Sequence, residues 1–170
     1  STPTITASGS TTFCQGNSIT LTSSSGSSYL WSTGATTQAI TASAGGNYSV
    51  AVTNANGCSV NSAATTVTVN PLPTITIFPN SISICSGAVS RPFTASGALT
   101  YNWFPNTGLS SGTGATVTAS PSTTTTYTVT GTTAGCQGTA LITVTVNPNP
   151  SVSITASPGI NVCSQSIMLT

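Results

Sequence analysis

Apolar and polar residues alternate along most of the chain, in short runs separated by glycine and asparagine. The clearest alternating runs are residues 18–22, 48–52, 66–69, 127–130 and 142–146. Alternation with a period of two is typical of β-strands that bury one face. No stretch of the sequence repeats its apolar residues with the period of a helix. The pattern therefore predicts an all-β protein.

The sequence also repeats itself over a longer interval. Residues 70–77, Asn-Pro-Leu-Pro-Thr-Ile-Thr-Ile, return at 147–154 as Asn-Pro-Asn-Pro-Ser-Val-Ser-Ile, and residues 3–6 carry the same start without the Asn-Pro. Each start is followed by a cysteine. Repeats of this kind indicate a tandem array. We predict domains at residues 1–70 and 71–147, and the first strands of a third, incomplete repeat at 148–170.

Each repeat fits a small antiparallel β-sandwich of the immunoglobulin-like type, with about seven short strands. Trp31 and Trp103 occupy the place of the tryptophan that such domains bury on their third strand. Tyr48 and Tyr127 stand where a tyrosine hydroxyl bonds back to the backbone at the start of the sixth strand. We interpret all four as core aromatics. Exposed tryptophans that stack on sugars are the alternative.

Charge is almost absent from the sequence and limits its function. Arg91 is the one charged side chain, and the chain has no Asp, Glu or His. General acid–base catalysis draws mainly on His and carboxylates, metal sites on carboxylates, His or clustered thiolates, and nucleic-acid binding on a basic surface. No apolar run approaches the ~20 residues of a membrane span. We therefore expect no enzyme activity, catalytic residue, metal, cofactor, nucleic-acid partner or membrane insertion.

Five cysteines without a C-x-x-C cluster favour disulfides, and hence an extracellular or cell-surface location. Pairing within each repeat would give Cys14–Cys58 and Cys85–Cys136. Cys14 is expected between the first and second strands and Cys58 between the sixth and seventh, at opposite ends of a sandwich. A strand spans ~17–20 Å, whereas disulfide-bonded Cα atoms lie within ~7 Å. We therefore prefer a bond between Cys14 and Cys136 across the domain junction, with the pairing within repeats as the alternative.

The same geometry leaves three cysteines without a partner in the sequence. Cys58 would pair with a repeat that precedes Ser1, and Cys85 with the hairpin of the third repeat. Cys163, in that third repeat, would also bond outside this sequence. The partners we expect are therefore other copies or further repeats of the same protein.

Three groups of residues together resemble a known family. They are Cys14-x-Gly16-x-Ser18 with the strand that follows, Tyr29-x-Trp31-Ser32-Thr33-Gly34, and Gly46-x-Tyr48 with the strand that leads to Gly57-Cys58. The second repeat carries a sister pattern in Tyr101-x-Trp103-x-Pro105 and Gly135-Cys136. These motifs resemble the immunoglobulin-like (PKD-like) repeats of large secreted and cell-surface proteins of Bacteroidetes. The resemblance implies export and a role as an adhesin stalk, a filament or a spacer beside a secreted enzyme.

The combined reading is a structural protein. We expect a stiff extracellular fibre or stalk, the shaft of a filament or adhesin, built from disulfide-linked tandem domains. The alternative is a carbohydrate-binding or spacer module of a secreted enzyme or adhesin, with glycans as its partners. Exposure of Trp31 and Trp103 would favour the carbohydrate-binding module over the structural role.

Overall fold

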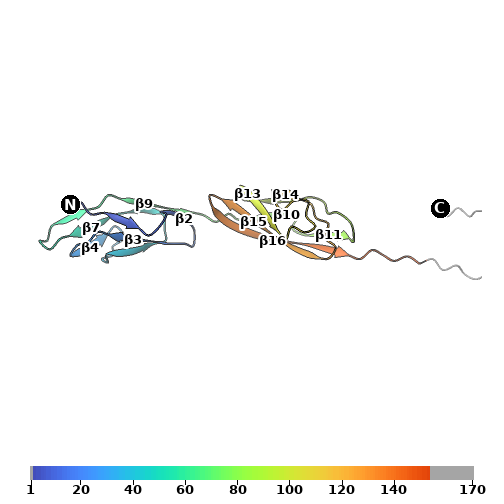
Figure 1. Ribbon diagram of the computed structural model, residues 1–170, viewed down its shortest axis with the longest axis horizontal. Helices are drawn as coiled ribbons and strands as arrows, with labels where there is room; N and C mark the ends of the chain where they lie inside the picture. The colour runs from blue at the N-terminus through green and yellow to red at the C-terminus, as the bar shows by residue number, and fades with distance from the viewer. Residues whose placement is uncertain (1, 154–170) are drawn as a thin grey trace, which may run out of the picture.

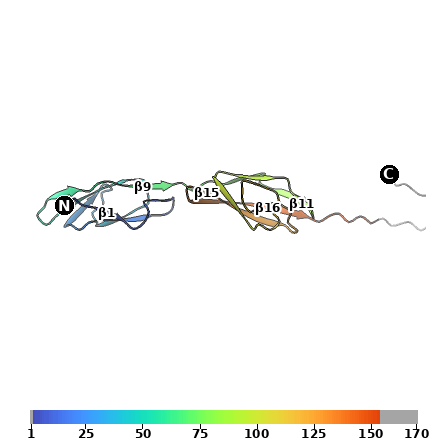
Figure 2. The same cartoon turned by 45° about the horizontal axis from the view of Figure 1, so that its top comes forward.

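The computed structural model describes residues 2–153, which form two β-sandwiches placed end to end (Figures 1 and 2). The described part of the chain contains strands and no helix. The strands of the first domain are β1 (Ile5–Ala7), β2 (Thr12–Cys14), β3 (Ile19–Ser23), β4 (Ser28–Trp31), β5 (Ala39–Ala42), β6 (Gly46–Tyr48), β7 (Val50–Thr53), β8 (Ser59–Asn61) and β9 (Thr65–Asn70). Those of the second are β10 (Thr76–Phe78), β11 (Ile82–Cys85), β12 (Phe93–Ser96), β13 (Thr100–Phe104), β14 (Thr116–Val117), β15 (Thr125–Thr133) and β16 (Cys136–Asn147).

Both domains have the strand order of an immunoglobulin-like sandwich. In the second domain, one sheet has the order β10-β12-β14 and the other β11-β16-β15-β13. The first domain repeats this plan, with β1-β3-β5 facing β2-β9-β6 and β4-β7-β8. Its last two long strands are interrupted, because Ser49 separates β6 from β7 and residues 62–64 separate β8 from β9. The prediction of an all-β, immunoglobulin-like tandem is confirmed.

One strand pair in each domain is parallel rather than antiparallel. Strand β2 runs parallel to β9, and β11 runs parallel to β16. The register places Cys14 opposite Asn70 and Cys85 opposite Asn147. The first edge segment of each domain thus changes sheets, and its final cysteine lies beside the residue where the chain leaves the domain.

Each sandwich encloses its own apolar core, which follows from the alternation of the strands. Strand β3 alternates buried and exposed positions from Ile19 to Ser23, and β11 does so from Ile82 to Cys85. The largest side chains with almost no exposure include Trp31 and Leu21 in the first domain, and Tyr127 and Phe93 in the second. Among the described residues, every buried side-chain nitrogen or oxygen has a hydrogen-bond partner.

A short linker connects the sandwiches. Strand β9 ends at Asn70 and β10 begins at Thr76. The second domain ends with β16 at Asn147, and residues 148–153 after it form no strand. The remainder of the predicted third repeat, with Cys163, lies outside the described residues.

Candidate functional site at the domain joint

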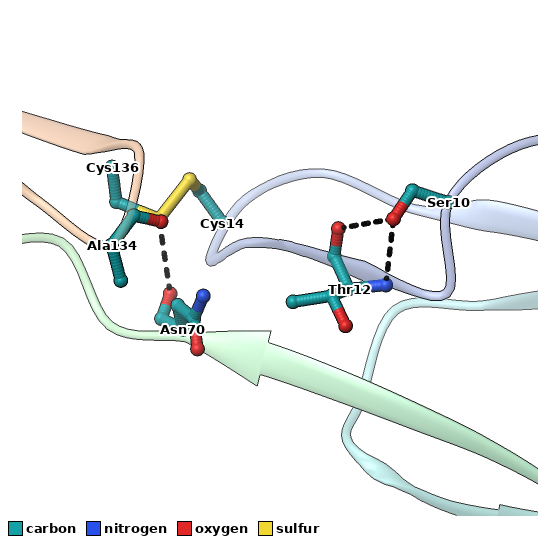
Figure 3. Close-up of a disulfide and its surroundings, with 6 residues drawn as sticks. All are labelled: Ser10, Thr12, Cys14, Asn70, Ala134 and Cys136. Atoms are coloured by element: carbon teal, nitrogen blue, oxygen red, sulfur yellow. Dashed lines mark hydrogen bonds between the residues drawn. A yellow bond between two sulfur atoms is a disulfide. The ribbon is translucent and has the colours of Figure 1, made fainter.

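A disulfide between Cys14 and Cys136 bridges the two domains (Figure 3). Their Cα atoms lie 5.6 Å apart, although the residues are 122 positions apart in the sequence. This is the pairing that the sequence analysis preferred. The alternative bonds Cys14–Cys58 and Cys85–Cys136 are absent, because Cys58 and Cys85 are both free and exposed. In each domain, one cysteine lies beside the exit residue, Asn70 or Asn147, and the other lies at the hairpin before the last strand.

Cys14 is positioned by a tight turn at the end of β2. The backbone N–H of Asn17 donates to the carbonyl of Cys14 at 3.1 Å. Gly16 has a φ of 94°, a conformation that glycine adopts without strain. The N–H of Gln15 donates to the carbonyl of Asn70 at 2.8 Å, which extends the parallel β2–β9 pairing by one residue. The turn is therefore fixed to the exit strand of the first domain.

Cys136 is positioned by the hairpin between β15 and β16. It pairs with Thr133 in the β-register, so Ala134 and Gly135 form a two-residue turn. Both turn residues have positive φ, 50° and 78°, as the tight turn that suits twisted strands requires. Only 1% of Cys136 is exposed, although it begins a strand at the tip of the domain. Its Sγ lies 4.0 Å from the carbonyl oxygen of Asn70 (Figure 3).

Glycines of the second domain allow the linker to approach it closely. A Cβ atom on Gly138 would overlap the carbonyl oxygen of Pro73, and one on Gly97 would overlap that of Thr74. A Cβ atom on Gly131 would likewise overlap the side chain of Ile75. The linker backbone therefore lies directly against β16 and the loop after β12, and the Ile75 side chain lies against β15. It cannot move as a free tether without losing these contacts.

Two covalent connections cross the joint side by side. One is the peptide chain after Asn70 and the other is the disulfide at Cys14, and these two residues are partners in the parallel β2–β9 pair. A single flexible linker would let the domains rotate about it. The joint therefore has two adjacent covalent connections and a linker in close contact with the second domain.

The free cysteines lie at the two outer ends of the described pair of domains. Cys85 ends β11 opposite Asn147, and Cys58 lies in the hairpin between β7 and β8. Both are exposed thiols. Their predicted partners are outside the described residues, so those pairings remain predictions.

The four aromatics that we interpreted as core residues are buried. Trp31 and Trp103 are 2% and 4% exposed. Their indole N–H groups donate to the carbonyls of Thr37 at 2.8 Å and Gly114 at 2.9 Å. Trp103 also packs edge-on against Phe93, with ring centroids 5.3 Å apart. Neither indole face is available to stack on a sugar.

The two tyrosines differ in the bond that their hydroxyls make. The Tyr48 hydroxyl donates to the carbonyl of Ala44, four residues upstream, at 2.9 Å. This is the expected tyrosine corner. The Tyr127 hydroxyl instead donates to the carbonyl of Thr107 at 3.0 Å, across the domain. The expectation of a corner was therefore wrong for Tyr127, because its hydroxyl lies against the loop between β13 and β14, at Thr107 and Gly108.

Two further tyrosines were not assigned a role from the sequence. The Tyr29 hydroxyl bonds both the N–H and the carbonyl of Gly26, at 2.9 and 3.2 Å. Tyr101 does the same with Ala98, at 2.8 and 2.9 Å. Each hydroxyl thus bonds to the loop that precedes the strand of its tyrosine, β4 for Tyr29 and β13 for Tyr101. Their signal was the repeated Tyr-x-Trp pattern, in which the tyrosine faces the same side of the strand as the core tryptophan.

The electrostatics of the described residues are correspondingly simple. Arg91 is exposed. Burial raises the pKa of the Tyr127 phenol above its usual value of 10.0, and the nearby Thr125 hydroxyl opposes part of this shift. Residues 2–153 contain no group of three or more side chains of the kinds that bind metals. Within the same range, no helix is long and apolar enough to span a bilayer.

No protein-family model matches the sequence, and no curated protein matches it. Solved structures do match. A chimeric titin Z1Z2–Z1Z2 tandem has 18% identity and a TM-score of 0.35, over 85% of this chain and 100% of that chain. The fibronectin(III)-like modules of Clostridium thermocellum CbhA have 12% identity and a TM-score of 0.40, over 85% and 95%. A marsupial T cell receptor has 11% identity and a TM-score of 0.43, over 92% and 76%.

All three similarities are low. The immunoglobulin-like assignment rests on the strand order of this chain. The disulfide is compatible with an oxidising, extracellular environment.

Proposed function

We propose that this chain is a structural segment of a stiff extracellular fibre or stalk, in a secreted or cell-surface protein of bacteria. The observation that carries the proposal is the doubled covalent connection at the joint, where the disulfide at Cys14 and the chain after Asn70 cross side by side. A spacer whose domains need only be tethered does not require the second connection. A shaft that must hold its direction does.

The surface chemistry supports the same role. With one charged residue in the whole sequence, neighbouring fibres experience little electrostatic repulsion. Most polar groups are hydroxyls of Ser and Thr, which do not titrate near neutral pH. The two tryptophans that could have formed a carbohydrate platform are buried instead. The observations therefore favour a shaft over a sugar-binding module.

Stiffness is tested by measuring whether the two domains tumble as one body. Residual dipolar couplings report an alignment tensor for each domain of the oxidised chain. We expect equal tensors for both domains. In the double variant Cys14→Ser/Cys136→Ser, the residual dipolar couplings of each domain still fit the structure of that domain. The alignment tensors of the two domains become unequal. Unequal tensors in the oxidised chain itself would contradict the proposal.

The oxidised state is tested in material from the native source. Mapping must use chymotrypsin or pepsin, because the only basic residue, Arg91, precedes Pro92 and offers trypsin no cleavable bond. A peptide pair joined through Cys14 and Cys136 is expected. Recovery of both as free thiols would argue against an extracellular location.

A further inference from the structure

The exposed thiol of Cys58 occupies the same position in the first domain as the bonded Cys136 in the second. The registers establish this, because Trp31 pairs with Val50 as Trp103 pairs with Val129. Two residues after Val50, Val52 pairs with Val60, and two residues after Val129, Gly131 pairs with Gly138. Cys58 and Cys136 each precede that last partner by two residues. Each also follows a glycine of positive φ, Gly57 or Gly135.

The exposed thiol of Cys85 likewise repeats the position of Cys14. Cys85 lies opposite Asn147 in the parallel β11–β16 pair, and the N–H of Ser86 donates to the Asn147 carbonyl at 2.9 Å. The N–H of Ala88 donates to the Cys85 carbonyl at 3.0 Å, around Gly87 with a φ of 82°. These contacts match those of the turn at Cys14. The described pair of domains therefore has one half of a joint at each end.

The end of the first domain that carries Cys58 also has a hollow in its surface. A hollow of about 270 Å³ is lined by Pro3, Gly26, Cys58 and Val60, among others. The corresponding place in the second domain is covered by the linker, whose Pro73 and Thr74 carbonyls lie against Gly138 and Gly97. The hollow is thus the place in the first domain that corresponds to the linker contact of the second domain.

The end that carries Cys85 offers a matching segment. Residues 148–150 have the Pro-x-Pro pattern of the linker at 71–73. The side-chain amide of Asn149 donates to the carbonyl of Ser86 at 3.3 Å, which keeps this segment beside Cys85. The Cys85 thiol and a linker-like segment therefore lie together at this end of the chain.

We propose that Cys85 of one copy forms a disulfide with Cys58 of the next, so that copies join head to tail and repeat the Cys14–Cys136 joint. This inference rests on the proposed function and names the partner of the free ends. An interface between two different surfaces does not close on itself unless it bends into a ring. Because the two domains lie end to end (Figure 1), successive copies add to an open chain.

The reaction is a thiol–disulfide exchange with an oxidised small-molecule disulfide such as glutathione disulfide. The Cys85 thiolate attacks that disulfide, which forms a mixed disulfide and releases one reduced thiol. The Cys58 thiolate of the next copy then attacks the Cys85 sulfur and releases a second reduced thiol. Two protein thiols lose two protons and two electrons, and the small-molecule disulfide gains them.

The test uses the chain with Cys163→Ser, folded with the Cys14–Cys136 bond intact and incubated in a glutathione redox buffer. Non-reducing electrophoresis should show a ladder of multimers that a reductant returns to monomer. The single variants Cys58→Ser and Cys85→Ser should each stay monomeric. A mixture of these two variants should stop at the dimer, with a Cys58–Cys85 peptide found by mass spectrometry.

Other outcomes overturn the inference. A dimer in either single variant alone would mean that like ends pair, through two Cys58 or two Cys85 residues. A monomer under all oxidising conditions would mean that the ends do not meet. Neither result alters the alignment tensors of the single chain, so failure of this inference is distinguishable from failure of the stiff shaft.

Discussion

Cys14 and Asn70 lie opposite each other in the parallel pair of β2 and β9, so the disulfide and the peptide chain leave the first domain at the same place. This relationship places two covalent connections next to each other at one joint. It depends on the change of sheets between β1 and β2, without which Cys14 would not pair with the exit strand. Strand pairing within a domain thus determines how the domains are connected.

Loss of the disulfide should destabilise the folded tandem. In the chain-entropy description, closing a loop between residues 122 apart stabilises the folded state by up to ~5 kcal/mol. We expect the double variant Cys14→Ser/Cys136→Ser to melt at a lower temperature by calorimetry. Cys58→Ser, which alters an exposed and unbonded thiol, should leave the melting temperature unchanged. Equal melting of all three proteins would contradict the prediction.

Gly138→Val should strain the joint without disturbing the second sandwich. The equivalent residue in the first domain is already a valine, Val60, so the strand itself accepts one. At position 138 the new Cβ would overlap the Pro73 carbonyl. Overpacking of this kind costs about 1–3 kcal/mol, which should shift the glutathione equilibrium of the Cys14–Cys136 bond toward the reduced form.

The matched control for that variant is Gly9→Ala, because a Cβ on Gly9 would have no atom within 4 Å. Its redox equilibrium should equal that of the parent chain. If Gly138→Val also leaves the equilibrium unchanged, the linker is not seated as described.

Tyr127→Phe should weaken the second domain only. It removes the 3.0 Å hydrogen bond to the Thr107 carbonyl, and the loss of such a bond typically costs about 1 kcal/mol. Tyr48→Phe removes the 2.9 Å bond to Ala44 and should weaken only the first domain. Denaturant unfolding of the reduced tandem, followed separately by NMR signals of each domain, measures both effects. A change in the domain that was not mutated would show that the cores are coupled without the disulfide.

Stability should vary little between about pH 4 and 8, since the sequence has no Asp, Glu, His or Lys. Alkaline pH is different. Burial raises the pKa of Tyr127 in the folded state, so the unfolded state loses its phenolic proton first as the pH rises. The stabilisation is complete below the unfolded pKa of 10.0 and is lost as the pH rises from there through the folded pKa.

Thermal melts from about pH 4 into the alkaline range measure both effects. In Tyr127→Phe, the alkaline loss of stability should be smaller than in the parent. A melting temperature that moves by many degrees between pH 4 and 8 would contradict the expectation of a flat profile.

Several features were predictable from sequence because they follow from period and distance. Alternation predicted the strands, and the limited reach of a disulfide favoured Cys14–Cys136 over bonds within a repeat. The positions of Trp31 and Trp103 followed from their place relative to neighbouring strands. None of these predictions required knowledge of which side chains are in contact in the folded protein.

Features that depend on tertiary register were not predictable. The sequence repeat aligns Pro3 with Pro73, but Ile5 pairs with Ser23 and Ile77 with Ala95. Ser23 and Ala95 each lie eight residues before their core tryptophan, so the structural equivalent of Pro3 is Ile75. The parallel pairing of β2 and the partner of Tyr127 were missed for the same reason. A three-residue strand carries too little alternation to reveal its neighbour.

The disulfide also determines which part of the chain bears tension. Force applied to the two ends passes along β2 to Cys14, across the bond to Cys136, and along β16 to Asn147. Residues 15–135, which include most of both cores, lie outside that path and cannot be drawn out while the bond holds. Reduction would release about 400 Å of extendable chain, since the bonded residues are 122 positions apart. The reach of the oxidised chain under load is therefore limited by covalent bonds, not by the folding free energy of its domains.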